Sequence, residues 1–350
     1  MTTKEIARLA NVSVGTVDRV IHNRGDVAEA TKARVLKIIK EANYEPNIYA
    51  RNLVLNKTYN ITALLPAFEA GEYWQGPSRG VERAAADLKK FGIQLNLVYF
   101  DQNSGASFNR QAEIVLKNKP DGVIVAPVLH VETHAFVKDL IQNDINVVSI
   151  DSKLDIHNVM GFVGQDSFQS GVLAARLISS GKKAQGKYKI VSIKSSENHN
   201  SILLDRISGF KEYFTRKFAD EVYFEEISIR LQNKGWNAIL ENFLKADADL
   251  CGVFVPNSKV HYVADYYNNK EKSNISIVGY DLIGENLKYL ENEIIDFLID
   301  QKPERQGYQA LELFYKQLLL KQDIRVDNFM PLNIITKENM MYPDVEITND

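Results

Sequence analysis

The spacing of apolar residues divides this chain into a short helical opening and a long body in which strands and helices alternate. Within residues 1–45 apolar side chains recur at helical intervals, which predicts three short helices, the third over about 28–43. From residue 60 onward short apolar runs alternate with amphipathic segments. The expected strands occupy 61–66, 94–100, 122–127, 147–150, 188–193, 221–229, 250–255 and 275–279, with helices at 75–90, 107–118 and 131–143. Two successive series of this kind predict two lobes, each a parallel sheet covered by helices on both faces.

The length and composition indicate an ordinary globular protein with about two domains. The chain has 350 residues, of which 45% are hydrophobic and 25% are charged. Its one cysteine, Cys251, cannot form an internal disulfide. Residues 1–13 lack the apolar core of a secretory signal, and no run approaches the ~20 apolar residues of a membrane span. We therefore expect a cytoplasmic protein that does not enter a membrane.

The charge is distributed unevenly between the two parts of the chain. Residues 1–58 contain 10 of the 42 Lys and Arg residues but only 6 of the 45 Asp and Glu residues. The remainder therefore holds 32 basic and 39 acidic residues, so a head of net charge +4 precedes a body of net charge −7. A small basic head on a larger acidic body is typical of a nucleic-acid-binding module attached to another domain.

The opening residues have the capping and turn signals of a helix-turn-helix. Thr2 and Glu5 are placed for a capping box at the start of the first helix, and Asn11 tolerates a left-handed backbone in the turn that follows. Ser13 is then a suitable N-cap for the second helix. Two helices joined by a three-residue turn describe a helix-turn-helix. A three-helix bundle that serves protein contacts is the alternative.

The start of the second helix has the side chains expected of a helix that enters the major groove. Residues 13–16 are small, so they do not block the approach of the helix N-terminus to the bases. The hydroxyls of Ser13 and Thr16 suit phosphate oxygens. Arg19, one turn further, can donate to both O6 and N7 of a guanine. The sequence therefore predicts DNA contact by this helix.

The head also carries a long series of residues in a recognisable order. The matching segments are TKEIARLA (3–10), VSVGTV (12–17), RVIHN (19–23), YEPN (44–47) and ARNL (50–53). With these, residues 2–58 closely resemble the DNA-binding head of the lactose/galactose repressor family. The resemblance implies that Val14, Gly15 and Arg19 lie at base edges. It places the following residues near phosphates: Thr3, Ser13, Thr16 and Asn23.

Two positions in the head depart from the family's pattern. Asp18 stands where the family usually has serine, so its carboxylate needs Arg19, Arg8 or a cytosine amino group as a partner beside the phosphates. Ala28 stands where the family commonly has a serine cap on the third helix. The missing cap should cost ~1 kcal/mol unless Asp26 replaces it.

Residues 47–58 are the expected linker between head and body. Residues 47–55 have a helical pattern of about two turns, which is too short for a stable helix alone in water. The resemblance implies that this segment becomes helical on operator DNA, packed against its dimer mate. It also implies that Leu53 wedges between base pairs in the minor groove, with Ala50 on the groove floor and Arg51 at the backbone. A passive tether whose leucines pack on the body is the alternative.

Polar and aromatic residues follow the predicted strands of the body, where a two-lobed α/β protein binds its ligand. Ligands of open parallel sheets bind at the carboxyl ends of the strands. The residues at these ends are Tyr73, Trp74, Asp151, Asp166, Asn257, Asp281 and Gln301. Carboxylates and amides that bind hydroxyl groups, together with aromatic faces that stack on ring C–H groups, suit a sugar. Taken singly, Asp281 and Asn257 could instead cap helices, and Trp74 could belong to the core.

Residues 61–336 also resemble the periplasmic sugar-binding proteins of the ribose-binding type. The segment RISGF at 206–210 matches that family's binding arginine, so the resemblance adds Arg206 to the candidate ligand residues. It implies a body over 59–350, with one lobe of about 61–165 plus 302–327 and another of about 166–301 plus 328–350. The expected fold class is a small all-α helix-turn-helix head, residues 1–46, joined to a two-lobed α/β domain with parallel sheets.

These features predict a homodimeric transcription regulator controlled by a small ligand. Two heads would bind a near-palindromic operator, because two-fold protein symmetry requires two-fold symmetry in the DNA. The ligand, a sugar or sugar derivative, would close the cleft and change the separation of the linkers. A ligand that favours splayed linkers would be an inducer, and one that favours apposed linkers would be a corepressor.

Two other classes of protein are alternatives to this function. A sugar-binding component of a transport system is disfavoured by the basic head and by the lack of a secretory signal. A sugar-processing enzyme with a regulatory head would turn over candidate sugars. The sequence has no Gly-rich dinucleotide motif, no phosphate loop, no metalloprotease motif and no visible nucleophile–base pairing. We therefore expect no catalytic residue, cofactor or metal.

Overall fold

The structure is a computed structural model, and it shows two compact units. It describes residues 1–21, 25, 27–42, 57–180, 186–194, 201–218, 222–245, 249–268, 270 and 275–342. The units are residues 1–57, the head, and residues 58–350, the body. Within these described ranges, no helix is both long and apolar enough to cross a membrane.

The head consists of three short helices, α1 (Thr3–Ala10), α2 (Val14–Ile21) and α3 (Glu29–Glu41). Ile6 on α1, Val17 on α2 and Val35 on α3 are fully buried against one another. The helical intervals of the apolar residues in the sequence therefore correspond to one shared core. Burial of this apolar surface holds helices that are too short to be stable alone.

The helix caps of the head agree with those that the sequence predicts. The predicted capping box is confirmed: the Thr2 N–H donates to Glu5 Oε2 over 2.7 Å, and Thr2 Oγ1 accepts the Glu5 N–H over 3.3 Å. Asn11 closes α1 in the left-handed region, with φ 51°. Ala28 provides no side-chain cap for α3, because its methyl group cannot accept a hydrogen bond. Asp26, the residue expected to replace it, lies outside the described residues.

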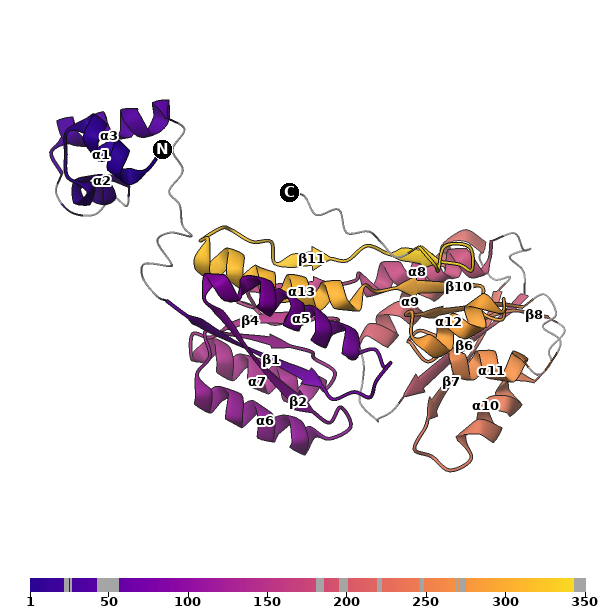
Figure 1. The fold of residues 1–350 in the computed structure, drawn as a ribbon. Helices are drawn as coiled ribbons and strands as arrows, with labels where there is room; N and C mark the ends of the chain where they lie inside the picture. Colours follow the sequence, from indigo (N-terminus) through magenta and orange to yellow (C-terminus); the bar gives the residue numbers. More distant parts are fainter. Residues whose placement is uncertain are drawn as a thin grey trace. The chain divides into compact units, whose positions relative to one another are not determined.

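The first lobe of the body is built on a six-stranded parallel sheet of order β11-β5-β4-β3-β1-β2. Its strands are β1 (Tyr59–Pro66), β2 (Ile93–Phe100), β3 (Gly122–Val125), β4 (Asn146–Ile150), β5 (Gly161–Gly164) and β11 (Asp327–Phe329). Figure 1 shows one pair of helices on each face of this sheet. The pairs are α5 (Gln75–Leu88) with α13 (Pro303–Phe314), and α6 (Gly105–Asn118) with α7 (His130–Gln142).

The second lobe repeats this arrangement, with strand order β12-β10-β9-β8-β6-β7. Its strands are β6 (Gly186–Lys194), β7 (Val222–Arg230), β8 (Leu250–Phe254), β9 (Ser276–Tyr280), β10 (Phe297–Asp300) and β12 (Asn333–Ile335), of which only β12 runs antiparallel to its neighbour. One face carries α8 (Ser167–Ile178) and α9 (Ser201–Phe218). The other carries α10 (Trp236–Leu244), α11 (His261–Asn268) and α12 (Gly284–Glu291). The predicted fold class is confirmed.

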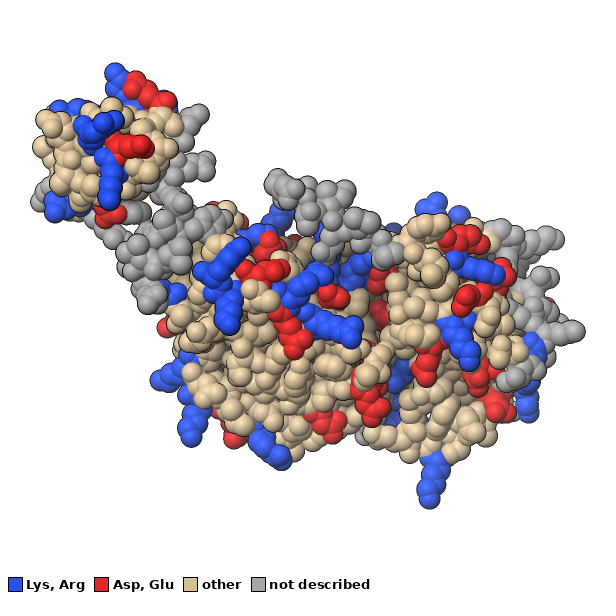
Figure 2. Space-filling model, viewed as in Figure 1, with Lys and Arg blue, Asp and Glu red and all other residues tan. Residues whose placement is uncertain are grey.

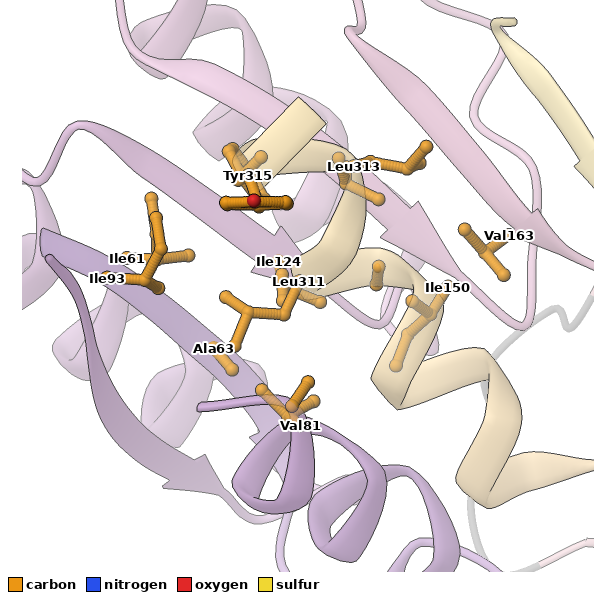
Figure 3. Close-up of a cluster of buried hydrophobic side chains, with 14 of the residues drawn as sticks. Ile61, Ala63, Val81, Ile93, Ile124, Ile150, Val163, Leu311, Leu313 and Tyr315 are labelled. Carbon is orange, nitrogen blue, oxygen red and sulfur yellow. The ribbon is translucent and has the colours of Figure 1, made fainter. Parts of the chain in front are cut away.

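The buried strands explain the apolar runs in the sequence. On β4, Val147 packs with the α6–α7 layer, whereas Val148 packs with the α5–α13 layer. Figure 3 shows the second of these layers, in which Leu311 of α13 reaches the strand residues Ile124 and Ala63. A strand covered on both faces is mostly apolar along its length, so its sequence reads as a near-continuous apolar run rather than an alternation.

The surface of the body mixes charges of both signs. Figure 2 shows Lys and Arg side chains interspersed with Asp and Glu over the visible face, without one large acidic region. Several of these charges pair, among them Arg83 with Glu304 at 2.7 Å and Lys316 with Glu312 at 3.0 Å. Exposed pairs of this kind contribute little to stability, so the fold depends mainly on its apolar layers.

Candidate functional site

A cavity of about 700 Å³ lies between the two lobes of the body. Seven of the eight predicted ligand residues line it: Tyr73, Trp74, Asp151, Arg206, Asn257, Asp281 and Gln301. The eighth, Asp166, does not line it. Asp166 instead caps α8, because its Oδ1 accepts the N–H of Gln169 over 2.9 Å. Asp166 therefore has an observed role as a helix cap, and its contact with a ligand stays a prediction.

The cavity lies where the order of strands reverses in each sheet. In the first sheet β1 lies between β2 and β3, and in the second β6 lies between β7 and β8. The loops that leave such neighbouring strands run in opposite directions and open a crevice at the strand ends. Tyr73 and Trp74 follow β1, and Asn257 follows β8. Because both lobes have this topology, their two crevices face the same cavity.

Two aspartates occupy equivalent positions in the two lobes. Asp151 follows β4 and Asp281 follows β9, the fourth strand of each lobe. Both have a left-handed backbone, with φ 66° and 69°, and both donate their N–H to the next strand over 3.0 and 3.1 Å. A non-glycine residue in this region is uncommon, and aspartate tolerates it better than most. The bend at each strand end brings both carboxyl groups to the cavity.

Arg206 is the buried cation of the site. It stands on α9 with 3% of its surface exposed. Its guanidinium donates to the Pro256 carbonyl over 2.8 Å and to Gln301 Oε1, and it lies 3.7 Å from the centroid of the Tyr280 ring. Within the described residues its Nε is buried without a hydrogen-bond partner. The guanidinium is therefore held in place with donor capacity left for a ligand.

Asp281 is a buried acid of the site with a strongly raised pKa. It is 2% exposed, and Gln301 Nε2 lies 3.0 and 2.9 Å from its two carboxyl oxygens. Burial raises the pKa of Asp281 to about 8, although the nearby Arg206 guanidinium and the Gln301 hydrogen bond lower it. Burial likewise raises the pKa of Asp151, against a hydrogen bond from Tyr73 and the charge of Arg206. These carboxyl groups lack the solvation that a ligand with hydroxyl groups would restore.

The perturbation of Asp281 predicts a pH dependence of stability. The pKa is raised from its ordinary 3.8 to about 8, so protonated Asp281 stabilises the fold fully below pH 4. This contribution to the free energy of unfolding is lost as the pH rises toward 8, by up to roughly 1.4 kcal/mol per pH unit. Chemical denaturation from pH 5 to 9 should show Asp281→Asn losing less stability with rising pH than the wild type. Parallel curves for the two proteins would contradict the raised pKa.

The aromatic side of the cavity comes from the first lobe. The Tyr73 hydroxyl donates to Asp151 Oδ1 over 2.7 Å, and the Tyr73 and Trp74 rings meet edge to face at 5.0 Å. Trp74 is 7% exposed and packs in the core of the lobe as well as lining the cavity. Trp74 is therefore both a core residue of the first lobe and part of the cavity wall.

A series of glutamines connects the site to the hinge between the lobes. Gln306 of α13 accepts the Asp151 N–H over 3.1 Å and donates to the Gln301 carbonyl over 2.8 Å. Gln165, which follows β5, donates to the carbonyls of Asp300 and Pro331 over 2.9 Å each. The segments at 165, 300–301 and 331, which cross between the lobes, are thus joined by hydrogen bonds next to the ligand residues.

Several residues that line the cavity were not predicted from the sequence. They are Glu69, Glu72, Gln102, Lys194, Lys259, His261, Tyr262 and Glu285. The signal that could have found some of them is the strand end itself: Lys194 is the last residue of β6, and Lys259 follows β8 by five positions. Glu69 and Gln102 likewise follow β1 and β2 by three and two positions. His261, Tyr262 and Glu285 instead stand on helices α11 and α12, whose paths the sequence does not reveal.

In the head, Ser13, Val14, Gly15 and Thr16 lie together at the start of α2, and Arg19 stands in the last turn of this helix. Ser13 caps this helix, since its Oγ accepts the Thr16 N–H over 3.1 Å and lies 2.9 Å from Thr16 Oγ1. Val14, Gly15 and Arg19 are exposed on the same helix, and Val14 is 44% exposed. Thr3 is half-buried at the start of α1. The other predicted contacts lie outside the described residues: Asn23, Ala50, Arg51 and Leu53.

Comparison with known families agrees with both units. Residues 2–47 match the model of the bacterial regulatory proteins of the lacI family, and residues 62–322 match that of a periplasmic binding protein domain. This chain belongs to the LacI family. It is a DNA-binding transcription regulator with a periplasmic-binding-protein-like domain.

Individual members of the LacI family support this assignment over most of the chain. The chain is 25% identical over 295 residues to the transcriptional regulator MalR of Streptococcus pneumoniae, covering 82% of this chain and 85% of MalR. It is 35% identical over 141 residues to the ribose operon repressor of Escherichia coli, 40% of each chain. A solved structure from Bacteroides fragilis, described as a LacI transcriptional regulator, superposes with a TM-score of 0.74 at 28% identity and covers 82% of this chain and 100% of that one. These two curated relatives are regulators rather than enzymes.

Proposed function

We propose that this LacI-family regulator acts in the cytoplasm as a homodimer on a near-palindromic operator. A carbohydrate bound between the lobes of the body controls its affinity for that operator. The ligand contacts Tyr73, Trp74, Asp151, Arg206, Asn257, Asp281 and Gln301. The protein carries out no reaction on the ligand.

The observation that carries this proposal is the chemistry of the cavity walls. Arg206, Asp151 and Asp281 are buried and surround one space with groups that donate to and accept from hydroxyls. The Tyr73 and Trp74 rings offer apolar faces for the C–H groups of a sugar ring. The buried carboxyl groups and the Arg206 guanidinium favour a ligand with several hydroxyls over a purely apolar one, because an apolar ligand would leave them unsatisfied.

The control of DNA affinity rests on the position of the site beside the hinge. Asp151 belongs to the first lobe, whereas Asp281 and Arg206 belong to the second. A ligand that contacts all three favours one relative position of the lobes, and it can shift an equilibrium only by its difference in affinity between the two positions. Gln306 and Gln301 connect these contacts to the segments that cross between the lobes.

The experiment that tests the ligand class is a thermal-shift screen of the full-length protein. Neutral aldoses and ketoses, sugar acids, sugar phosphates, purines and amino acids serve as probes. We expect at least one carbohydrate to raise the melting temperature and to change binding to an operator selected from random duplexes. Stabilisation by a purine or amino acid alone would refute the carbohydrate assignment, and turnover of a bound sugar would refute the lack of catalysis.

For the head, we propose that Arg19, in the last turn of the recognition helix α2, reads a base. Arg19 is exposed on α2 beside Val14 and Gly15, neither of which has a polar side chain. An added Cβ at Gly15 would meet only Ser13 Oγ at 3.7 Å, so the fold of the head does not itself require glycine there. Close approach to DNA gives a reason for a small residue at this position.

Replacing Arg19 by alanine should therefore reduce discrimination between operator and random DNA by ~1–3 kcal/mol. Fluorescence anisotropy at one fixed salt concentration measures both affinities. Lys37→Ala on α3 removes the same charge from an exposed position and is the matched control, which should leave the discrimination unchanged. An equal loss of affinity for both duplexes in Arg19→Ala would show that Arg19 contacts only phosphates.

A further inference from the structure

Two lysines stand at the point where the strand order reverses in the second lobe. Lys194 is the last residue of β6, and Lys259 follows the neighbouring strand β8. Both line the cavity between the lobes, and both are half-buried. Neither position is among the ligand contacts proposed above, so these lysines are a separate feature of the cavity wall.

Asn257 fixes the backbone that carries both lysines. Its Nδ2 donates to the Ile193 carbonyl over 2.6 Å, and its Oδ1 accepts the Lys259 N–H over 3.2 Å. The side chain of Asn257 therefore ties the residue before Lys194 to Lys259 itself. Asn257 and the two lysines all line the cavity.

Neither ammonium group has an ion-pair or hydrogen-bond partner among the residues that the structure describes. Burial lowers the pKa of Lys259, and the charges of Glu72 and Glu285 only partly oppose this effect. These two glutamates are exposed at the cavity rim and have nearer partners. Glu285 Oε2 lies 3.2 Å from His261 Nε2, and Glu72 Oε2 accepts the Glu69 N–H over 3.0 Å.

The two glutamates are exposed whereas the two lysines are half-buried, so the lysines have the stronger electrostatic effect on a ligand in the cavity. An exposed carboxylate is solvated and screened, so its effect at a distance is small. A half-buried cation is partly desolvated, and without a partner it carries a cost that an anion in the cavity would remove. Lys194 and Lys259 thus form the cationic part of the wall, apart from the Arg206 guanidinium, which already donates to protein groups.

We infer that the ligand is an acidic carbohydrate whose carboxylate or phosphate group binds between Lys194 and Lys259. This inference rests on the proposed function, because it assigns the ligand class of the same cavity. The hydroxyl-bearing end of the ligand contacts Arg206, Asp151 and Asp281. The cavity of about 700 Å³ has room for both ends. Charge-assisted hydrogen bonds to the two ammonium groups select the acidic ligand over its neutral parent.

The test compares neutral sugars with their acidic counterparts on the full-length protein. D-Glucose and D-galactose are titrated by calorimetry against the matching uronates and 6-phosphates, at low and at high salt. We expect one of the anionic classes to bind at least roughly tenfold more tightly than its neutral parent, with the advantage reduced at high salt. The uronate and phosphate arms show which anionic group fits the space.

Variants of the two lysines locate the effect. Lys194→Met and Lys259→Met keep most of the length of the side chain and remove its charge. Each should weaken binding of the acidic sugar roughly tenfold and change binding of a neutral sugar less than twofold. Lys117→Met, at an exposed position of α6, is the matched control and should change neither.

The outcomes separate this inference from the proposed function. Neutral sugars that bind as tightly as the acidic ones would overturn the inference and leave the carbohydrate assignment standing. An acidic preference that survives both lysine variants would also overturn it, because the anion would then bind elsewhere. Failure of every carbohydrate to bind, with binding of a purine or amino acid, would overturn the proposed function and the inference with it.

Discussion

Replacing Gly209 by alanine should unfold the second lobe or destabilise it by about 3 kcal/mol or more. An added Cβ at Gly209 of α9 would lie 2.0 Å from the Phe168 carbonyl oxygen of α8. On the other helix, a Cβ at Gly171 would lie 2.0 Å from the Arg206 carbonyl oxygen. Both obstacles are backbone atoms, so no side chain can rotate away and the two helices would have to separate.

The Gly209→Ala substitution would also disturb the ligand site. Arg206 lies three residues before Gly209 on the same helix, so a displaced α9 moves the guanidinium away from Gln301. Urea denaturation of the full-length protein measures the change in stability. Gly284→Ala is the control, because a Cβ there meets nothing within 4 Å. A Gly209→Ala variant within 1 kcal/mol of the wild type would show that the helices can separate at little cost.

Replacing Arg206 by methionine should weaken ligand binding by roughly 10²-fold while leaving the ligand-free protein able to bind its operator. The loss corresponds to about one or two hydrogen bonds from a charged donor. Methionine retains much of the apolar volume of the side chain over the Tyr280 ring. Asp281 keeps its bond from Gln301, and its raised pKa means that the loss of the cation does not strand a buried charge.

Two measurements check the Arg206 prediction. Calorimetry with the tightest-binding sugar of the screen gives the loss of ligand affinity, and anisotropy with the selected operator gives DNA binding without ligand. Arg110→Met, on an exposed position of α6, is the matched control. Ligand affinity unchanged in Arg206→Met would remove the guanidinium from the proposed contacts. Lost operator binding would instead indicate a general failure of the fold.

Much of the fold could be predicted because its signals are local. The capping box at Thr2 and Glu5 needs only a spacing of three residues, and the structure contains it. The strands β1 and β4 are buried on both faces, so they appear in the sequence as apolar runs within two residues of their observed bounds. The expected strand ranges omit β5 as well as β11 and β12. β5 has only four residues, two of them glycines, so its apolar run is very short. β11 and β12 have three residues each and are paired on one side only, so neither produces an apolar run.

The candidate ligand site was predicted only in part, for a related reason. A residue at a strand end can turn toward the ligand or toward its own helix, and both uses suit an aspartate. Asp281 and Asp151 turn into the cavity, because a left-handed backbone bends the chain there. Asp166 has an extended backbone, and its carboxylate instead accepts the N–H of Gln169. The sequence pattern is the same in the three cases, and the backbone angle separates them.

By itself the sequence determined that this chain has a basic helix-turn-helix head, two series of βα units and a set of polar strand-end residues. Each of these depends on neighbours within a few positions along the chain. Only the tertiary structure decided that Lys194 and Lys259 share a wall with Arg206, that Gln306 joins Asp151 to the hinge, and that Gly209 and Gly171 are sites of backbone contact. These relations join segments that are far apart in sequence. They are fixed by how sheets and helices pack, which no local pattern records.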